Sequence, residues 1–416
     1  MEKVKIVIVG GGTAGITVAS MLKKKFSPSD IVIIEPSERH AYQPLWTLVG
    51  GGVVSREETA RPMKSVIPKG VKWIQEKVAT FEPEENQVTL SDGKTIEYEF
   101  LVVAPGIQLD FENIKGVVGN LGKGNGLCSN YTWDTMNSTW EEIKNFKGGT
   151  AIFTFPTNPI KCAGAPQKIM WLAEESFRKA GIGDKTKIIY VAPGGAMFGI
   201  ERYKIPLNAM AKERGIETMF GHHLTAVDAD NKKATLTEVA TGKETIIDYD
   251  MMHITPPMSA PDFIKHSSIS TAKSLDVEEL KTLCYEITPS SEALGYVEVD
   301  KFSTQHVTYK NIFSIGDASS LPCSKTGAAI RKQAPVMAEN LYLVSQGKAP
   351  TAKYNGYASC PLVTDRSHVM LAEFGYDGVI MESFPFAQNK PRRSMWFLKR
   401  HALPSLYWNM MLKGKV

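Results

Sequence analysis

The sequence predicts an α/β protein with two Rossmann-like dinucleotide-binding domains and a further C-terminal segment. A glycine-rich turn follows a β-branched strand near the N-terminus, and a second strand-to-turn pattern occurs near residue 190. A length of 416 residues is also too great for one ordinary core. The domains we expect are residues 1–115 with 296–349, residues 116–295, and a C-terminal region, 350–416.

The composition is that of a globular protein, with 43% apolar residues, 22% charged residues and a formal net charge of +4. The basic residues form no stripe with interleaved aromatic residues, so we expect no nucleic-acid partner. No apolar run reaches the roughly 18 to 20 residues that a bilayer-spanning helix needs. We also expect no transit or targeting segment before the first strand.

The five cysteines are too widely spaced for a disulfide framework, and neither CxxC nor HxxxH occurs. The cysteines therefore predict no metal site. In a reducing compartment they are either buried apolar residues or catalytic ones. They are Cys128, Cys162, Cys284, Cys323 and Cys360.

The first βαβ unit carries a dinucleotide fingerprint, Gly10-x-Gly12-x-x-Gly15, between the strand 5–9 and a helical pattern. The first glycine permits the tight turn, the second lets the backbone approach a pyrophosphate, and the third lets the helix pack on the sheet. Phosphates are expected at the helix N-terminus and ribose hydroxyls at the acid that ends the next strand. A glycine-rich turn without a ligand is the alternative. The predicted nucleotide-binding residues are Gly10, Gly12, Thr13, Ala14, Gly15 and Glu35.

Two later segments indicate FAD rather than NAD. Alternating strands from Trp73 to Val103, with an Asp92-Gly93 turn, lead into Ala104-Pro105-Gly106. This turn resembles one in the flavoproteins that have two dinucleotide domains. The segment 311–317 resembles their late motif, whose acid, here Asp317, binds the ribityl chain. A helix is expected to follow from Lys325 to Gln346.

The second domain lacks a working nucleotide motif. Its turn after the strand 187–191 has the wrong glycine spacing, and Met197 and Phe198 crowd the pyrophosphate position. No acid ends the next strand in register, so nicotinamide binding is disfavoured. Residues 262–295 are polar and lack periodicity, which indicates an insertion.

Cys162 and Cys360 lie in unusual settings. Cys162 precedes a helix that begins near Pro166, and a thiol there beside Lys161 should have a lowered pKa. Cys360, next to Pro361, is predicted to lie at a turn. A buried structural cysteine is the alternative for Cys162.

The chain resembles the sulfide:quinone oxidoreductases over nearly its whole length, especially the branch that includes the mitochondrial enzyme. We expect a prokaryotic-type chain without a transit peptide. Long and chemically unusual strings carry the resemblance. They are Tyr42–Gly50, Lys161–Lys168, Thr255–Ser259, Ser324–Thr326, Ser359–Val363 and Tyr407–Met411.

The resemblance implies that Cys162 and Cys360 form a redox-active pair, bridged directly or through extra sulfur. Sulfide would attack at Cys360 and leave a persulfide there. The freed Cys162 thiolate would pass two electrons to FAD, and ubiquinone or menaquinone would receive them. A small nucleophile would take up the sulfur. Cys128 departs from the mitochondrial pattern and is a further catalytic candidate, with a spectator as the alternative.

The resemblance also implies residues that hold FAD. The helix that starts near Lys325 would aim its positive end at the flavin and stabilise the reduced form, although a solvated lysine is the alternative. Besides the fingerprint, the residues implied are Gln43, Pro44, Val78, Ala104, Pro105, Gly106, Gly316, Asp317, Lys325 and Thr326.

The C-terminal region predicts two short amphipathic helices, Met395–Leu398 and 403–412, separated by Lys399-Arg400-His401 and Pro404. Aromatic faces with basic partners are typical of membrane-docking segments, so we expect peripheral attachment to the plasma membrane at its cytoplasmic side. Packing on the protein's own core or in a homo-oligomer is the alternative. The quinone-pocket candidates are Phe384, Phe386 and Lys399.

Two other functions compete with this prediction. One is a type II NADH:quinone oxidoreductase, which the degraded middle glycine motif and the matched cysteines disfavour. The other is a noncatalytic membrane-bound flavoprotein that senses thiols or persulfides, which the intact flavin motifs disfavour.

Overall fold

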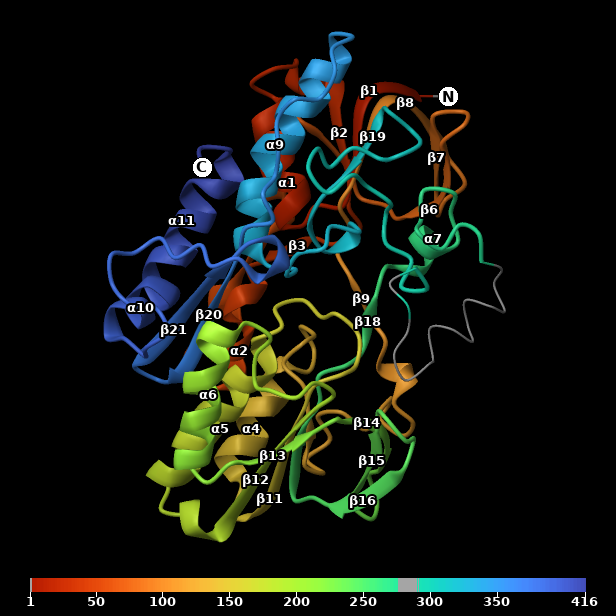
Figure 1. Ribbon diagram of the computed structural model, residues 1–416. Helices are drawn as coiled ribbons and strands as arrows, with labels where there is room; N and C mark the ends of the chain where they lie inside the picture. The colour runs from red at the N-terminus through yellow and green to blue at the C-terminus, as the bar shows by residue number, and fades with distance from the viewer. Residues whose placement is uncertain (1, 276–289, 291) are drawn as a thin grey trace.

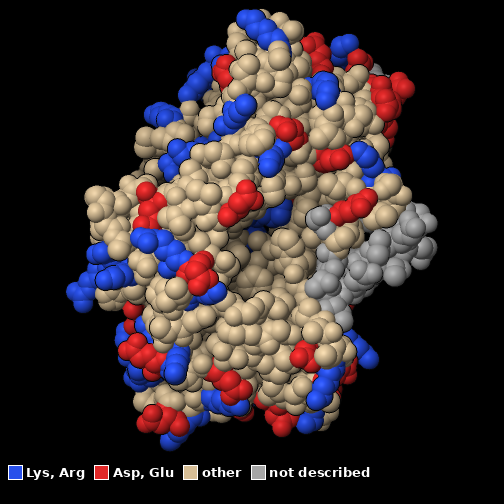
Figure 2. Space-filling model, viewed as in Figure 1, with Lys and Arg blue, Asp and Glu red and all other residues tan. Residues whose placement is uncertain are grey.

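The structure is a computed structural model that describes residues 2–275, 290 and 292–416. The predicted insertion falls in part on residues 276–289 and 291, which lie outside the described residues together with Cys284. Figure 1 shows two α/β domains, one above the other, with the C-terminal segment beside them. Acidic and basic side chains are interspersed on the face in Figure 2, which is hollowed near its centre.

The first domain is built on a sheet with the strand order β5-β2-β1-β8-β7-β6, and β19 also pairs with β8. β1 pairs in parallel with β2 and β8, and Ile6, Val7 and Ile8 are fully buried. A central parallel strand is covered on both faces, which explains this continuous apolar run. The helices α1 and α9 pack together beside the sheet. The bounds are β1 Glu2–Val9, α1 Thr13–Leu22, β2 Ile31–Ile34, β3 Arg39–Ala41, α2 Trp46–Gly50, β4 Ala60–Pro62, α3 Met63–Val66, β5 Lys72–Ile74, β6 Val78–Glu82, β7 Gln87–Leu90, β8 Thr95–Val103, β19 Ile312–Ser314 and α9 Gly327–Ser345.

The second domain has a parallel sheet in the order β10-β17-β11-β12-β13 and a smaller antiparallel sheet, β14-β15-β16. The short antiparallel pair β9 and β18 lies where the domains meet. The bounds are β9 Gln108–Leu109, β10 Leu127–Cys128, α4 Met136–Asn145, β11 Gly149–Thr154, α5 Ala165–Lys179, β12 Thr186–Ala192, α6 Glu201–Glu213, β13 Glu217–Phe220, β14 His222–Asp228, β15 Lys233–Glu238, β16 Glu244–Asp248, β17 Met251–His253 and β18 Met258–Ser259. The short helix α7 Asp262–Lys265 packs instead beside β6 of the first domain.

The C-terminal region begins with the hairpin β20 Ala358–Asp365 and β21 His368–Phe374. The helices α10 Arg393–Phe397 and α11 Leu403–Asn409 follow where two short helices were predicted. The expected break between them is wrong, because a π-helical turn at Leu398–Ala402 joins them and Pro404 lies in the first turn of α11. Among the described residues, no helix has the length and apolar character required to span a bilayer.

The apolar side of the C-terminal region is largely buried. Met395, Tyr407, Trp408, Met411 and Leu412 pack into the core of the first domain. Packing on the protein's own core, the alternative to membrane docking, therefore holds for these side chains. Phe397 and Met410 stay exposed, at 63% and 40%.

Candidate active site

A cavity of about 430 Å³ lies between the glycine-rich loop, the start of α5, the β20–β21 hairpin and the C-terminal helices. Segments from all three regions of the sequence therefore contribute to one site. The predicted residues that line it are Gly12, Thr13, Ala14, Gln43, Pro44, Ala104, Pro105, Gly106, Cys162, Asp317, Lys325, Thr326, Phe384 and Lys399.

Two sulfur atoms that are 198 positions apart in the sequence meet at this cavity, with 3.3 Å between Cys162 Sγ and Cys360 Sγ. Cys162 lies in the loop before α5 with a φ of +55°, and its N–H donates to the Lys325 carbonyl over 2.9 Å. The predicted turn at Cys360 is wrong. The residue is in β20, where it is opposite Ala372 of β21, and a rigid strand therefore holds its sulfur.

Gly164 explains how the two sulfurs come so close. A Cβ atom at this position would lie 2.3 Å from Leu362 Cδ2 and 2.6 Å from Cys360 Sγ. Such contacts would force the Leu362 side chain and the Cys360 sulfur away from the start of α5. The absence of a side chain at Gly164 is therefore a steric condition for the cysteine pair.

The two thiols are electrostatically different. A hydrogen bond from Cys360 and the ammonium of Lys168, whose Nζ donates to Cys162 Sγ over 3.0 Å, hold the pKa of Cys162 well below its usual range. The same interaction with the Cys162 thiolate, together with burial, raises the pKa of Cys360. Cys162 is therefore the thiolate of the pair, and Cys360 keeps its proton.

The cation at the Cys162 sulfur is not the predicted one. Lys161 Nζ donates instead to Gln43 Oε1 over 2.8 Å and lies 5.3 Å from the centre of the Trp46 ring. Burial lowers the pKa of Lys161 to about 8. Lys168 was not singled out in the sequence, although it belongs to the segment Lys161–Lys168; only the turn of α5 brings it back to the thiol.

Cys128 is separated from the pair by its place in the fold. It lies in β10 with no exposed surface, and its Sγ donates to the Met252 carbonyl over 3.5 Å. Burial raises the pKa of its thiol, which keeps the thiol protonated. It is not among the residues that line the cavity, so the structure gives no support to its candidacy as a catalytic residue.

The glycine-rich loop has the shape that a dinucleotide requires. The space beside Gly12 is open, whereas a Cβ at Gly15 would lie 1.9 Å from the Gly10 carbonyl oxygen. No side chain caps α1, so its first N–H groups stay available for phosphates. Glu35 accepts hydrogen bonds from the N–H groups of Gly11 and Ser37 over 2.7 and 2.8 Å, which places its carboxylate beside the loop.

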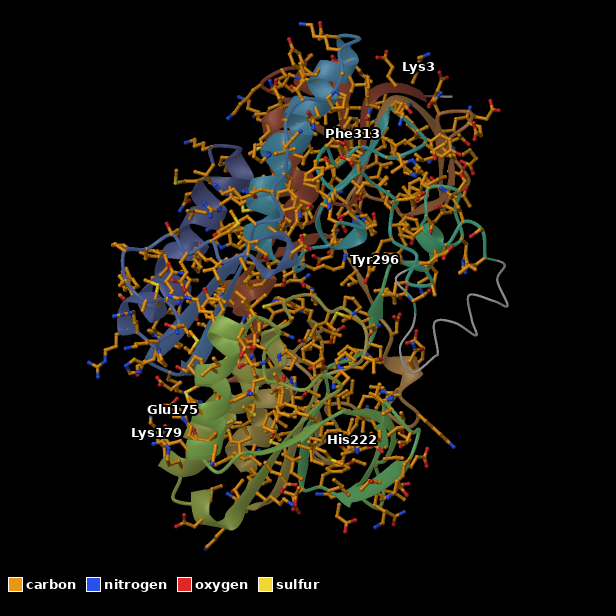
Figure 3. The ribbon with its side chains drawn as sticks, viewed as in Figure 1. Lys3, Glu175, Lys179, His222, Tyr296 and Phe313 are labelled. Carbon is orange, nitrogen blue, oxygen red and sulfur yellow. The ribbon has the colours of Figure 1, made fainter. Side chains whose placement is uncertain are left out.

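Lys325 is buried rather than solvated, so the solvated-lysine alternative is wrong. Its Nζ donates to the carbonyls of Asp317 and Ser319 over 2.8 and 3.0 Å and lies 3.7 Å from the centre of the Tyr296 ring. Figure 3 labels Tyr296 at the lower end of the first domain. Burial lowers the pKa of Lys325 to about 8. Thr326 caps α9 by accepting a hydrogen bond from the Ala329 N–H.

Five residues expected at FAD lie outside the cavity wall, namely Gly10, Gly15, Glu35, Val78 and Gly316. Val78 is buried in β6, where it packs in the core of the first sheet. Gly316 has a φ of +73°, and its N–H donates to Gln333 Oε1 over 2.9 Å. Gly316 therefore shapes the turn that presents Asp317, whereas Val78 has no such link to the cavity.

A hydrogen-bonded chain ties the C-terminal region to the glycine-rich loop. His40 Nδ1 donates to the Gly11 carbonyl over 2.8 Å, so its Nε2 accepts from the Tyr407 hydroxyl over 2.5 Å. The Thr13 hydroxyl then donates to the Tyr407 oxygen over 2.9 Å. Burial lowers the pKa of His40 to about 4, so the ring is neutral and this direction is fixed.

Two of the three quinone-pocket candidates, Phe384 and Lys399, line the cavity. Phe384 lines the cavity and stacks on Phe386, with 5.3 Å between the ring centres. Lys399 is buried in the π-helical turn, and its Nζ donates to the Pro44 carbonyl over 2.5 Å. Burial lowers the pKa of Lys399 to about 7. Leu398, Leu403 and Leu406 add an apolar side that was not predicted.

Comparison with known proteins assigns the family. A model described as pyridine nucleotide-disulphide oxidoreductase matches residues 4–141. The mitochondrial sulfide:quinone oxidoreductase of Dictyostelium discoideum is 46% identical over 413 residues, which are 99% of this chain and 86% of that protein. The mitochondrial enzyme of the same name from Mus musculus is 42% identical over 411 residues, with the same two coverages. The chain belongs to the sulfide:quinone oxidoreductase family.

The fold of this sulfide:quinone oxidoreductase family member agrees with a solved structure. The X-ray structure of the sulfide:quinone oxidoreductase from Aquifex aeolicus superimposes with a TM-score of 0.79 at 20% identity, covering 100% of this chain and 92% of that chain. The protein is an FAD-dependent oxidoreductase with the two-domain fold. The open space at Gly12 and the uncapped start of α1 fit that cofactor.

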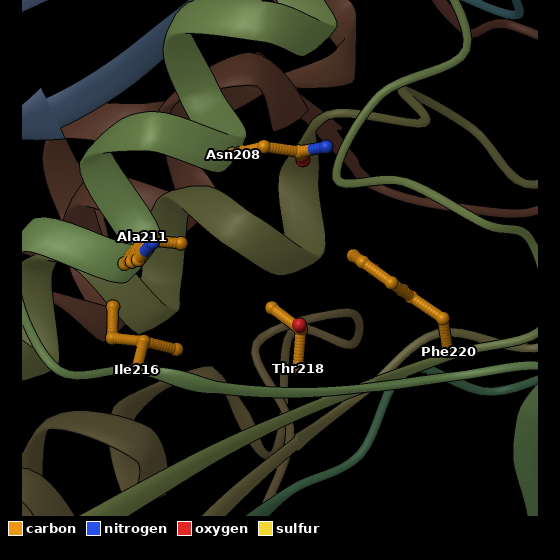
Figure 4. Close-up of a pocket in the computed structure, with 6 residues that line it drawn as sticks. Asn208, Ala211, Ile216, Thr218 and Phe220 are labelled. Atoms are coloured by element: carbon orange, nitrogen blue, oxygen red, sulfur yellow. The ribbon is translucent and has the colours of Figure 1, made fainter.

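The second domain of this sulfide:quinone oxidoreductase family member gives little support to NADH binding. Met197 and Phe198 are buried after β12, and the Met197 carbonyl accepts from Gln167 Nε2 over 2.9 Å. β13 ends at Phe220 without an acid. A separate pocket of about 370 Å³ (Figure 4) lies against α6 and β13, lined by Asn208, Ala211, Lys212, Ile216, Thr218 and Phe220. The type II NADH:quinone oxidoreductase of Staphylococcus haemolyticus matches only 28% of this chain, at 28% identity.

Proposed function

We propose that the protein oxidises hydrogen sulfide to sulfane sulfur at Cys162 and Cys360 and delivers two electrons through FAD to a membrane quinone. The 3.3 Å between the two sulfurs is the observation that carries the proposal. Two S–S bonds of about 2.05 Å that meet at a near-tetrahedral angle span about 3.3 Å, so the pair has room for one bridging sulfur. The names of the relatives support sulfide as the substrate and quinone as the acceptor.

The chemistry begins at the bridged pair. Hydrosulfide attacks the bridging sulfur, the bond between that sulfur and Cys162 breaks, and Cys162 leaves as a thiolate while two added sulfurs stay on Cys360. Lys168 stabilises this leaving group, since its Nζ lies 3.0 Å from Cys162 Sγ. The outer of these two sulfurs then passes to a small nucleophile, which leaves a persulfide on Cys360 whose terminal sulfur can form the bridge to Cys162 again.

Two electrons leave the pair when its bridge forms again. Bound FAD supplies the chemistry of accepting this electron pair and passing it to a quinone. Gly12 and the N-terminus of α1 would hold the pyrophosphate, and Glu35 the ribose. Lys325 would place a cation at the flavin, with its ammonium fixed by two backbone carbonyls.

We also propose that the protein is peripheral to the plasma membrane and that quinone enters the cavity from lipid. The leucines of the C-terminal helices, together with Phe384, give the cavity an apolar side. Exposed Phe397 lies in the same segment as Lys390, Arg392, Arg393 and Arg400, and each cation near an anionic surface contributes about 1 kcal/mol. Attachment at the cytoplasmic side of the membrane and formation of a homo-oligomer remain predictions.

A stopped-flow comparison tests the proposal. Anaerobic sulfide should bleach the flavin, and decylubiquinone should restore its absorbance. Bleaching by NADH instead would support a type II NADH:quinone oxidoreductase. No bleaching by either reductant would support a noncatalytic sensor.

Cysteine variants test the pair itself. Cys162→Ser and Cys360→Ser should each abolish sulfide-dependent quinone reduction, because neither leaves two sulfurs to be bridged, while FAD stays bound. Steady-state decylubiquinone reduction and the flavin absorbance of the purified variants measure the two properties. Near-normal turnover in either variant would falsify the pair mechanism, and Cys128→Ser is the matched control.

A further inference from the structure

A buried carboxylate, Glu373, lines the cavity and has no place in the mechanism above. It lies on β21 directly opposite Ser359, the residue before Cys360 on β20. The residue is only 3% exposed. A carboxylate at such a place needs compensation, because a charge loses its hydration when it is buried.

Hydrogen bonds supply this compensation. One carboxylate oxygen accepts from the Tyr357 hydroxyl. The other accepts from the Ser383 N–H, the Ser383 hydroxyl and Gln388 Nε2 over 2.9, 2.7 and 2.8 Å. Burial alone would raise the pKa of Glu373, but these neutral donors outweigh it and hold the pKa below its usual range. Glu373 is therefore an ionised carboxylate that links the hairpin to residues 383–388 through hydrogen bonds.

The segment that Glu373 holds carries the aromatic pair of the cavity. Ser383 and Gln388 flank Phe384 and Phe386, and the Phe384 N–H donates to Gln388 Oε1 over 2.8 Å. The preceding residue, Glu382, is fastened separately on the outside by Arg202, over 2.6 and 2.8 Å. The hydrogen bonds to the Glu373 carboxylate thus set the position of the Phe384 ring in the cavity wall.

We infer that Glu373 is a positioning residue for the electron acceptor: its carboxylate holds Ser383 and Gln388, and through them fixes Phe384 against the cavity where the quinone binds. This inference rests on the proposed function. Because Cys162 and Lys168 make none of these hydrogen bonds, the residue serves the quinone step and leaves the sulfide step untouched.

Glu373→Gln is the test, because the amide has the same shape but offers one acceptor oxygen to four donors. We expect decylubiquinone to show a KM about tenfold higher, or to reoxidise the reduced flavin about tenfold more slowly. Bleaching by sulfide should stay within about twofold of the unmodified protein, as should reoxidation by ferricyanide, a soluble acceptor that needs no quinone pocket. Ser383→Ala, which removes one donor, should change the quinone step in the same direction by less.

Each outcome decides the inference. Unchanged decylubiquinone kinetics in Glu373→Gln and Ser383→Ala would overturn it. An equal loss in bleaching, ferricyanide reoxidation and quinone reduction would also overturn it, since Glu373 would then serve the fold alone. Failure of the unmodified protein to bleach with sulfide or to recover with decylubiquinone would instead refute the proposed function. The control is Glu141→Gln, which removes an exposed carboxylate from α4.

Discussion

At the scale of single residues, the site is set by groups that meet only after folding. Lys161 is adjacent to Cys162 in the sequence, yet Lys168 is the lysine that contacts the Cys162 sulfur. The positive φ of Cys162 turns the chain before α5, and the helix then carries Lys168 back over the thiol. Adjacency in the sequence was therefore a poor guide to electrostatic contact.

Lys168→Met should raise the pKa of Cys162 towards its ordinary value. In the unmodified protein the lowered pKa keeps Cys162 ionised at pH values below the ordinary pKa of a thiol. The variant therefore has less thiolate at low pH, and the difference between the two proteins disappears as the pH rises. In the reduced protein, iodoacetamide modification of Cys162 near pH 6 should slow by about tenfold and recover at alkaline pH. Peptide mass spectrometry measures the rate at Cys162 alone. Lys161→Met is the matched control, and an equal effect in that variant would contradict the assignment of Lys168.

At the scale of elements, the start of α5 and the strand β20 act as one unit. Gly164 lets the two approach, and the N–H of Cys162 is fixed by the Lys325 carbonyl just before α9. Three elements thus hold one sulfur in place. Because the sulfurs react only when they are close, small displacements of these elements should have large effects on rate.

Gly164→Ala should separate the sulfurs without removing any reactive group. The new methyl would overlap Cys360 Sγ and Leu362, whereas the backbone at this residue, with φ −86°, accepts alanine. We expect the rate of flavin bleaching by sulfide to fall by about 100-fold, with FAD retained. Gly183→Ala is the control, since its Cβ would meet nothing closer than 3.6 Å. If Gly164→Ala bleaches at the same rate as the unmodified protein, the cysteine pair does not require a glycine at position 164.

The elements also show what a sequence can predict. The predicted Asp92-Gly93 turn is present with a positive φ at Gly93, and Pro166 lies in the first turn of α5, because local sterics decide both. Cys360 was expected at a turn because of Pro361, but pairing with β21 overrides that local signal. Glu373 gave no local signal, since its partners lie 10 to 16 residues away.

At the scale of the whole molecule, the C-terminal region has two uses. Tyr407, Trp408 and Met411 complete the core of the first domain, while Phe397 is left exposed in a basic segment. Only the exposed part is available to a lipid surface. The burial of the rest could not be predicted, because an amphipathic face has the same pattern whether it meets lipid or protein.

Vesicle flotation tests this division. The protein should float with vesicles of phosphatidylcholine and phosphatidylglycerol, and less so at high salt, because screening weakens its basic contacts. Phe397→Glu should lower the bound fraction by about tenfold, since it removes an exposed ring that would insert into the lipid and adds a charge that anionic lipid repels. Ile246→Glu, on the exposed strand β16, should bind like the unmodified protein. Equal flotation of both variants would refute attachment through α10.

The hydrogen bonds from Thr13 through Tyr407 and His40 to Gly11 join two distant segments of the polypeptide at one binding wall. During synthesis, the partner of the glycine-rich loop on α11 emerges from the ribosome 394 residues after Thr13. The dinucleotide pocket can therefore reach its final form only after α11 has been made. Loading of the flavin becomes a late event in the maturation of this protein, and an incomplete chain would hold it less firmly.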